Sequence, residues 1–139
     1  MLIIVGFGNE LRGEDAFGVD VIAKLQKLQL PNTKLISTFQ LTPELSLELK
    51  DAKKIIFIDA SYCIDNQYKL ACALDNHSSN SLSHQISIKT LMYMIKELYS
   101  KNPTYEVFSM LTNSFNEIQN KKNYERCIKE TIKSLQIVN

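Results

Sequence analysis

The sequence predicts an α/β fold, a single three-layer sandwich in which a mostly parallel, twisted sheet of about five strands carries helices on both faces. Short apolar runs alternate along the chain with segments whose apolar residues recur at helical spacing. The 139 residues contain no internal repeat, low-complexity segment or linker, and a chain of this length can bury one sizeable core. We therefore expect one domain over residues 1–139.

The first half of the chain is predicted to hold three strands and two helices. Leu2–Val5 is a continuous apolar run, typical of a strand buried on both faces. A helix follows, with one apolar stripe made of Phe17, Val21, Leu25 and Leu28. Thr42, Pro43 and Glu44 are typical of a helix start, as N-cap, first helical residue and first-turn acid. Two further strands are predicted at Lys34–Phe39 and Ile55–Ile58.

The second half is predicted to hold two strands and two helices. Tyr68–Leu74 alternates only loosely and indicates an edge strand that is able to run antiparallel, and a polar loop follows it. Tyr105–Leu111 is the last predicted strand, and Glu117–Leu135 is a terminal helix with one apolar face. The clearest helical stripe in the chain consists of Ile88, Leu91, Met92, Ile95, Leu98 and Tyr99.

Composition and charge limit the classes of partner. Hydrophobic residues make up 45% and charged residues 22%, an ordinary globular balance, and the net charge is only +1. Such a charge provides no strong field for nucleic acid or an anionic membrane, so we expect neither as a partner. No apolar run approaches the roughly 20 residues of a membrane-spanning helix, and no signal peptide pattern opens the sequence. We therefore expect a cytoplasmic protein without membrane insertion.

A glycine-rich turn, Gly6–Gly18, follows the first predicted strand. Such a turn suggests a nucleotide site, but Leu11 stands where a dinucleotide fingerprint needs its third glycine, and no Gly-Lys-Ser/Thr is present. Glu14 and Asp15 would also repel a phosphate at the helix N-terminus. The structural alternative is a tight turn whose acids complement the helix dipole, and this segment alone does not decide between the two.

Three polar residues are expected to converge at one edge of the sheet. Asp15 follows the first predicted strand, Asp59 directly follows the apolar run ending at Ile58, and His84 lies in the loop after the fourth strand. Each alone is more often a cap or a solvated residue, but ligands bind at the carboxyl ends of parallel strands. Two carboxylates and one imidazole suit an open site for nickel, zinc, iron or manganese. The other histidine, His77, has no such neighbours.

Taken in order, these segments resemble the hydrogenase maturation proteases, endopeptidases specific for the large subunit of nickel-iron hydrogenases. The family's opening signature is a strand, Gly-x-Gly-Asn, an acidic pair and a further glycine, which is similar to Gly6–Asn9 followed by Glu14–Gly18. The resemblance runs from the start of the chain to about residue 115. Its later matching segments, in family order, are Gln40–Leu45, Ile55–Ala60, Ser83–Ser87 and Thr112–Phe115.

The resemblance implies a role for each of the three candidates. Asp15, the second acid of the pair, takes the place of the family's first metal ligand, Asp59 that of the second and His84 that of the third. In the family this site probes nickel already inserted in the hydrogenase large-subunit precursor, whose C-terminal extension is then removed. By this resemblance the three residues are catalytic and metal-contacting, and the precursor is the partner. The isolated protein, expected to be a monomer, has this site empty or holds another divalent cation there.

The chemistry of cleavage stays open from the sequence. A metal-bound water or a carbonyl polarised by nickel fits the ligand set, and so does an aspartyl-type route with Glu14 or Asp15 as general base. The three cysteines form no CxxC pair and have no recognisable histidine partner, so we expect neither a disulfide framework nor a thiol nucleophile. The alternatives to a protease are a nucleotide-binding α/β module and a non-catalytic nickel-binding maturation chaperone.

Overall fold

The computed structural model describes residues 1–65, 67–73, 86–115 and 117–138. Within these ranges the chain forms one sheet and helices of very different length. The strands are β1 (Leu2–Phe7), β2 (Thr33–Thr38), β3 (Lys54–Tyr62), β4 (Lys69–Ala73) and β5 (Thr104–Thr112). The helices are the 3-10 helix η1 (Gly13–Ala16) and the α-helices α1 (Phe17–Gln26), α2 (Leu45–Leu49), α3 (Ile88–Tyr99) and α4 (Lys121–Val138).

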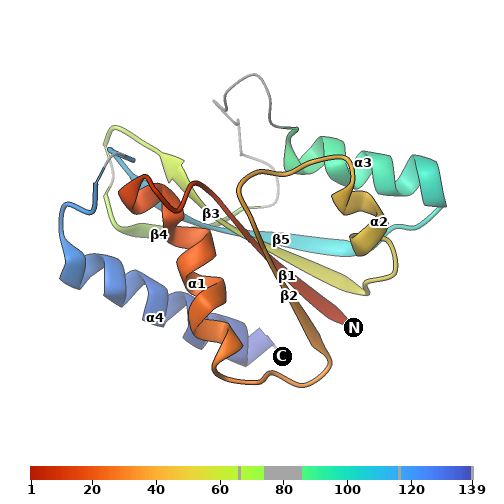
Figure 1. Ribbon diagram of the computed structural model, residues 1–139, viewed down its shortest axis with the longest axis horizontal. Helices are drawn as coiled ribbons and strands as arrows, with labels where there is room; N and C mark the ends of the chain where they lie inside the picture. Colours follow the sequence, from red (N-terminus) through yellow and green to blue (C-terminus); the bar gives the residue numbers. More distant parts are fainter. Residues whose placement is uncertain (66, 74–85, 116, 139) are drawn as a thin grey trace.

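The sheet confirms the predicted three-layer α/β architecture. Its strand order is β2-β1-β3-β5-β4, with α1 and α4 on one face and α2 and α3 on the other (Figure 1). Four strands are parallel, and β4 pairs antiparallel with β5 at the edge, as its loose alternation predicts. Tyr62 and Lys69 are too close in sequence for the helical crossover that a parallel connection needs, so the chain returns in the opposite direction.

Two apolar cores fill the spaces between the sheet and the helices. Along β3, Ile55 and Phe57 face α2 and α3, whereas Ile56 and Ile58 face α1 and α4, because successive side chains of a strand point to opposite faces. All four are fully buried, and burial of such a side chain contributes about 1.5–3 kcal/mol. The same alternation directs the next residue of the strand, Asp59, to the face covered by α2 and α3.

Two helices of the first half are shorter than predicted. α1 ends at Gln26, so Leu28 lies beyond the helix and is exposed instead of belonging to its apolar stripe. α2 begins at Leu45 without a side-chain cap. Thr42 and Pro43, predicted as N-cap and first helical residue, lie in the turn before it, where their carbonyl groups accept backbone hydrogen bonds.

The helices of the second half differ in detail from the prediction as well. In α3, Leu98 is exposed, so the apolar stripe is narrower than the spacing predicts. α4 begins at Lys121 and not at Glu117. The backbone N–H of Gln119 donates to the buried side chain of Glu14, so this part of the chain packs against η1 before the helix begins. Tertiary contacts thus decide where this helix starts.

Among the described residues, no helix combines the length and the apolar character needed to cross a lipid bilayer.

Candidate active site

The turn after β1 places Asp15. Gly8 has a φ of 147°, which favours glycine, and a Cβ built there would lie 2.0 Å from the backbone oxygen of Asp15. The backbone N–H of Asn9 donates to Asp15 Oδ2 at 3.3 Å, and Asn9 Oδ1 accepts from the N–H of Leu11 at 2.9 Å. The turn therefore lies directly against η1, and a side chain on Gly8 would displace Asp15.

Asp15 itself is partly buried in η1. Burial raises the pKa of its carboxyl above the ordinary value, while the hydrogen bond from Asn9 and the charge of Arg12 act in the opposite direction. The protein thus holds this carboxylate in place but compensates its charge only partly. A carboxylate of this kind is suited to meet a cation that comes from outside the chain.

Asp59 lies on the central strand β3, which continues past it to Tyr62 and does not end before it as predicted. Its Oδ1 accepts a hydrogen bond of 2.6 Å from the hydroxyl of Ser109, its register partner on β5. Burial, and in addition the nearby charge of Asp15, raise the pKa of Asp59 to about 7, against the lowering effect of Ser109. The carboxyl therefore exchanges its proton near neutral pH.

The structure brings two of the three predicted site residues together. Asp15 follows β1, Asp59 lies toward the carboxyl end of the adjacent parallel strand β3, and the charge of Asp15 acts on the pKa of Asp59. His84, and His77 with it, lies outside the described residues. Because β4 runs antiparallel, the argument from carboxyl strand ends does not extend to His84, whose assignment rests on the family resemblance alone.

The nearest described residue after His84 that has a clear structural role is Ser87. Ser87 is the N-cap of α3, with its Oγ accepting the N–H of Thr90 at 3.0 Å. α3 covers the same face of the sheet to which Asp59 points. Within residues 1–65, 67–73, 86–115 and 117–138, no group of three or more His, Cys, Asp or Glu side chains is arranged to hold a metal ion. Asp15 and Asp59 are thus an incomplete ligand set.

Glu14, the other acid of the pair, points into the opposite core. Its side chain is fully buried and accepts hydrogen bonds from the hydroxyls of Tyr68 and Thr112 and, at 3.1 Å, from the backbone N–H of Gln119. The Tyr68 hydroxyl in turn accepts the N–H of Asn120 at 2.6 Å. We call these five residues the Glu14 cluster. A fully buried carboxylate cannot contact a substrate, so Glu14 is removed from the candidates for general base.

The sequence analysis did not identify the residues that hydrogen-bond to Glu14 and Asp59. The sequence nevertheless contains one indication of them. Ser109 and Thr112 are polar residues inside or at the end of the apolar strand β5, and both are buried. A buried hydroxyl needs a hydrogen-bond partner, which indicates a polar contact on each face of the strand. No local pattern in the sequence indicates Tyr68 or Gln119 as partners of Glu14.

An aromatic rim lies beside Arg12, whose charge acts on Asp15. The guanidinium of Arg12 lies 6.0 Å from the ring centre of Phe115, and the ring of Tyr62 packs edge-on against Phe115 with 6.3 Å between centroids. Leu11, next to Arg12, is 89% exposed. Tyr62 is the last residue of β3, and the other rim residues follow β1 and β5, so the rim lies at the carboxyl ends of three parallel strands.

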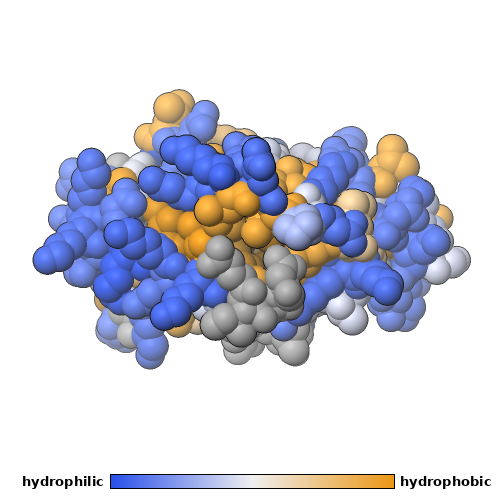
Figure 2. Space-filling model, turned by 90° about the horizontal axis from the view of Figure 1, so that it is seen from below, coloured by the Kyte–Doolittle hydropathy of each residue, from blue (hydrophilic) through white to orange (hydrophobic). Residues whose placement is uncertain are grey.

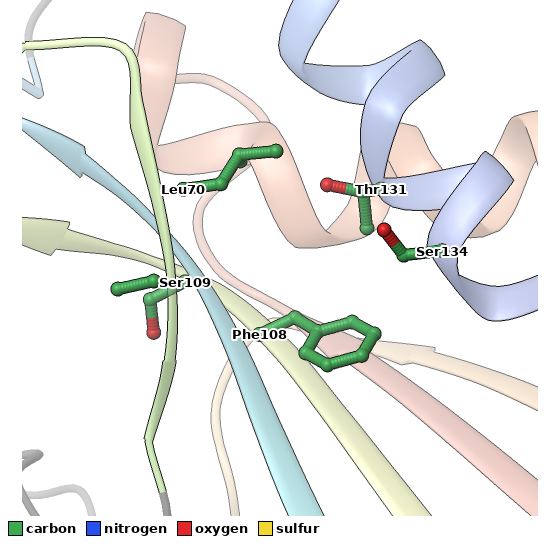
Figure 3. A pocket seen from close by; sticks show the side chains of 6 residues that line it. Leu70, Phe108, Ser109, Thr131 and Ser134 are labelled. Carbon is green, nitrogen blue, oxygen red and sulfur yellow. The ribbon is translucent and has the colours of Figure 1, made fainter. Parts of the chain in front are cut away.

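A pocket of about 140 Å³ lies on the other face of the sheet, between β4, β5 and α4. Its lining includes Leu70, Phe108, Thr131 and Ser134, and Figure 3 shows the hydroxyl of Ser109 pointing away from α4. Seen from below the view of Figure 1, the surface shows apolar residues gathered between polar ones (Figure 2). Ser109, which donates to Asp59, is also among the residues that line this pocket, whereas Asp59 itself faces α2 and α3.

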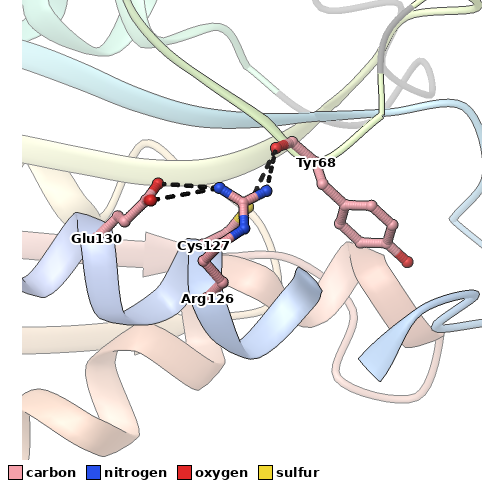
Figure 4. Close-up of polar contacts among 4 residues, drawn as sticks. All are labelled: Tyr68, Arg126, Cys127 and Glu130. Atoms are coloured by element: carbon pink, nitrogen blue, oxygen red, sulfur yellow. Dashed lines mark hydrogen bonds and ion pairs between the residues drawn. The ribbon is translucent and has the colours of Figure 1, made fainter. Parts of the chain in front are cut away.

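Neither of the two cysteines whose side chains are described, Cys63 and Cys127, forms a disulfide bond. Cys127 is buried in α4 and donates to the carbonyl of Tyr68 at 3.4 Å, beside the contact that Arg126 makes with the same oxygen (Figure 4). Burial raises the pKa of the Cys127 thiol. Cys63 is partly exposed. A buried thiol that keeps its proton is a poor nucleophile, in line with the expectation that Cys127 takes no part in catalysis.

Together, the strand order and the two aspartates define an α/β protein with an acidic site at the carboxyl ends of adjacent parallel strands, where such folds bind ligands. No protein-family model matches the sequence.

Comparison with known proteins points to the family that the motifs resemble. Over 62 residues the chain is 42% identical to a protein of Methanocaldococcus jannaschii provisionally named a hydrogenase maturation protease, and the match spans 42% of this chain and 40% of that relative. The [NiFe] hydrogenase maturation protease HycI of Thermococcus kodakarensis has a TM-score of 0.72 at 22% identity, covering 97% of this chain and 92% of its own. The maturating endopeptidase HybD of Escherichia coli has a TM-score of 0.79 at 14% identity, covering 99% and 93%.

These comparisons confirm the predicted resemblance and the predicted fold. The solved structures share the fold of this chain over nearly its whole length, and the Methanocaldococcus relative adds sequence similarity over part of it. The resemblance to hydrogenase maturation proteases therefore no longer depends on short motifs alone.

Proposed function

We propose that this protein is an endopeptidase that removes the C-terminal extension of a nickel-loaded [NiFe] hydrogenase large-subunit precursor. The observation that carries the proposal is the pair Asp15 and Asp59 at the carboxyl edge of the sheet, within a fold shared with known maturation endopeptidases. The name of the similar Methanocaldococcus protein supports the same activity.

In this proposal nickel arrives with the substrate. Asp15, Asp59 and His84 offer only three side chains, too few for a closed site but suited to contact a metal that the precursor already holds. Both carboxylates and the imidazole must be deprotonated to contact a cation. The raised pKa of Asp59 therefore makes recognition of the loaded precursor sensitive to pH near neutrality.

Hydrolysis itself is proposed to follow an aspartyl-type route. A carboxylate beside the scissile bond can take a proton from the water that attacks the carbonyl and give it to the leaving amine as the C–N bond breaks. We assign this role to Asp59, whose carboxylate Ser109 orients through Oδ1. The rim, with Leu11 and Tyr62 exposed and Phe115 partly exposed, offers an apolar surface beside this site on which the extension can lie.

The nucleotide-binding alternative is less well supported. The backbone N–H of Asn9, which a phosphate would need as a donor in this turn, donates to the carboxylate of Asp15. The acidic pair also places negative charge at the start of η1. We therefore favour the protease over a nucleotide-binding module.

Incubation with the precursor tests the proposal, with intact mass as the readout. We expect the nickel-loaded precursor to lose its C-terminal extension and the nickel-free precursor, in chelator, to stay intact. Asp15→Asn, Asp59→Asn and His84→Ala should each fail to cleave, whereas Asp51→Asn, at an exposed carboxylate beside Lys50, should cleave normally. Equal cleavage of loaded and nickel-free precursor would refute the nickel-reading role. No cleavage at all, with retained binding of the loaded precursor, would favour the non-catalytic chaperone.

A further inference from the structure

The Glu14 cluster joins the helical turn that carries Asp15 to three other parts of the fold. Glu14 is the residue before Asp15 in η1, and its donors come from the residue before β4, the end of β5 and the segment before α4. Burial of a carboxylate is costly unless donors surround it, and an apolar residue would fill the same space without that cost. Stability alone therefore does not account for an acid at this position.

Tyr68, the donor next to β4, is held in an unfavourable backbone conformation. Its φ of 57° lies in the left-handed region, which bulky residues rarely adopt. Its N–H donates to the carbonyl of Leu111 at 2.8 Å, and its own carbonyl accepts from Arg126 and Cys127 (Figure 4). Contacts on both sides of the residue thus fix its hydroxyl toward Glu14. Conformations of this kind are retained where the surrounding structure determines them, often at functional sites.

The backbone beside Glu14 is constrained as well. Gly13, the first residue of η1, has a φ of 51°, and a Cβ on it would lie 2.4 Å from the Cα of Glu117. The segment before α4 therefore lies directly against η1 on one side. On the other side, a Cβ on Gly8 would contact the backbone oxygen of Asp15 at 2.0 Å. The position of Asp15 is thus set by contacts of its neighbours, with Glu14 as the polar anchor.

We propose that Glu14 is a positioning residue, which acts through the hydroxyls of Tyr68 and Thr112 to hold Asp15 in the place where it faces Asp59. Glu14 itself touches no substrate because it is fully buried. The kinetic consequence of this inference rests on the proposed protease function. The structural consequence, a rigid η1, does not.

A second tyrosine supplies a matched control. The hydroxyl of the buried Tyr124 on α4 donates to Asp20 Oδ2 on α1 at 2.6 Å. Like the hydrogen bond from Tyr68 to Glu14, it joins a buried tyrosine to a carboxylate in the N-terminal helical region. Asp20 lies in α1, beyond the turn that carries Asp15. Tyr124→Phe therefore removes a bond of the same chemistry without releasing η1.

The test uses Tyr68→Phe, the pair Thr112→Val and Thr112→Ser, and the control Tyr124→Phe in the full chain. Hydrogen exchange of residues 9–16 and steady-state cleavage of the nickel-loaded precursor are measured well below the unfolding temperature. We expect Tyr68→Phe and Thr112→Val to speed exchange in this segment and to lower kcat by about 10²-fold, as expected for a misplaced catalytic group, with little change in KM. Thr112→Ser keeps the hydroxyl, so this variant should show wild-type exchange in residues 9–16 and wild-type kcat.

Tyr124→Phe should lose thermal stability while keeping wild-type exchange in residues 9–16 and wild-type kcat. Unchanged exchange and kcat in Tyr68→Phe and Thr112→Val would overturn the inference, and so would an equal loss of kcat in Tyr124→Phe, which would indicate a general stability effect. If the wild-type protein cleaves no precursor, the proposed function fails. The exchange measurement then decides the positioning role by itself: faster exchange in the two cluster variants and not in the control supports it, and uniform exchange refutes it.

Discussion

Asp59→Asn is expected to stabilise the folded protein above neutral pH while leaving its stability nearly unchanged near pH 4. Asparagine has almost the same size as aspartate, and its Oδ1 can still accept the hydrogen bond that Ser109 donates at 2.6 Å. The substitution therefore removes the negative charge of a partly buried group and little else. The charge is what the interior of the protein disfavours.

The size of the effect follows from the difference between two pKa values. The pKa of the Asp59 carboxyl is about 7 in the folded protein, against 3.8 for an ordinary aspartate such as that of the unfolded chain. Each pKa unit corresponds to about 1.36 kcal/mol, so a difference of about three units corresponds to about 4 kcal/mol at full ionisation. That is a large fraction of the stability of a typical domain, about 5–15 kcal/mol.

The sign follows from proton binding. Below pH 3.8 the Asp59 carboxyl is neutral in both the folded and the unfolded state, so it then does not reduce the free energy of unfolding. As the pH rises from about 4 to 7, the unfolded chain loses this proton while the folded protein keeps it, so the free energy of unfolding falls with pH. Above pH 7 the full cost is present. The stability difference between Asp59→Asn and wild type should therefore grow between pH 4 and 7 and stay constant at higher pH.

Urea unfolding at several pH values between 4 and 8.5, in chelator, measures this difference. Asp51→Asn is the control, because Lys50 lies 2.9 Å from this exposed carboxylate and lowers its pKa. The control should show no gain in stability between pH 5 and 8. A stability difference for Asp59→Asn that is the same at pH 5 and pH 8, or a loss of stability at pH 8, would refute the reasoning.

Three further predictions concern the proposed activity. Gly8→Ala places a Cβ 2.0 Å from the backbone oxygen of Asp15, so it should lower cleavage by about 10²-fold while circular dichroism still shows a folded protein; unchanged cleavage by a folded variant would contradict this role. Cys63→Ser should process the precursor at a near-normal rate in the intact-mass assay, whereas lost cleavage with an unchanged fold would reopen a thiol mechanism. Affinity for the nickel-loaded precursor should weaken as the pH falls through about 7, because Asp59 must lose its proton to contact a cation and an imidazole must be neutral to do so. Calorimetric titration at pH 6 and 8 measures this, and equal affinity at both values would argue against direct contact of either group with nickel.

The local pattern of the sequence was sufficient for the elements and for the class of fold. Buried strands such as Ile55–Ile58 are recognisable because a strand covered on both faces must be apolar throughout, and the helices because their apolar residues recur with the helical period. Neighbouring parallel strands then have their carboxyl ends at the same edge of the sheet. This is why the proximity of Asp15 and Asp59 was predictable, whereas a place for His84 was not, since β4 runs antiparallel.

The residue pattern left Glu14 and Asp15 both open as general base, and only the tertiary structure shows why these two adjacent acids differ. Glu14 and Asp15 are chemically similar and adjacent in sequence, yet η1 directs Glu14 into the core against α1 and α4 and leaves Asp15 near Asp59 on the other face. Glu14 is buried because Tyr68, Thr112 and Gln119, all distant in sequence, supply donors to it. A local sequence pattern reflects the conformational preferences of residues that are close together along the chain. The cost of burying a carboxylate depends on donors that come together only when the strands and α4 have packed.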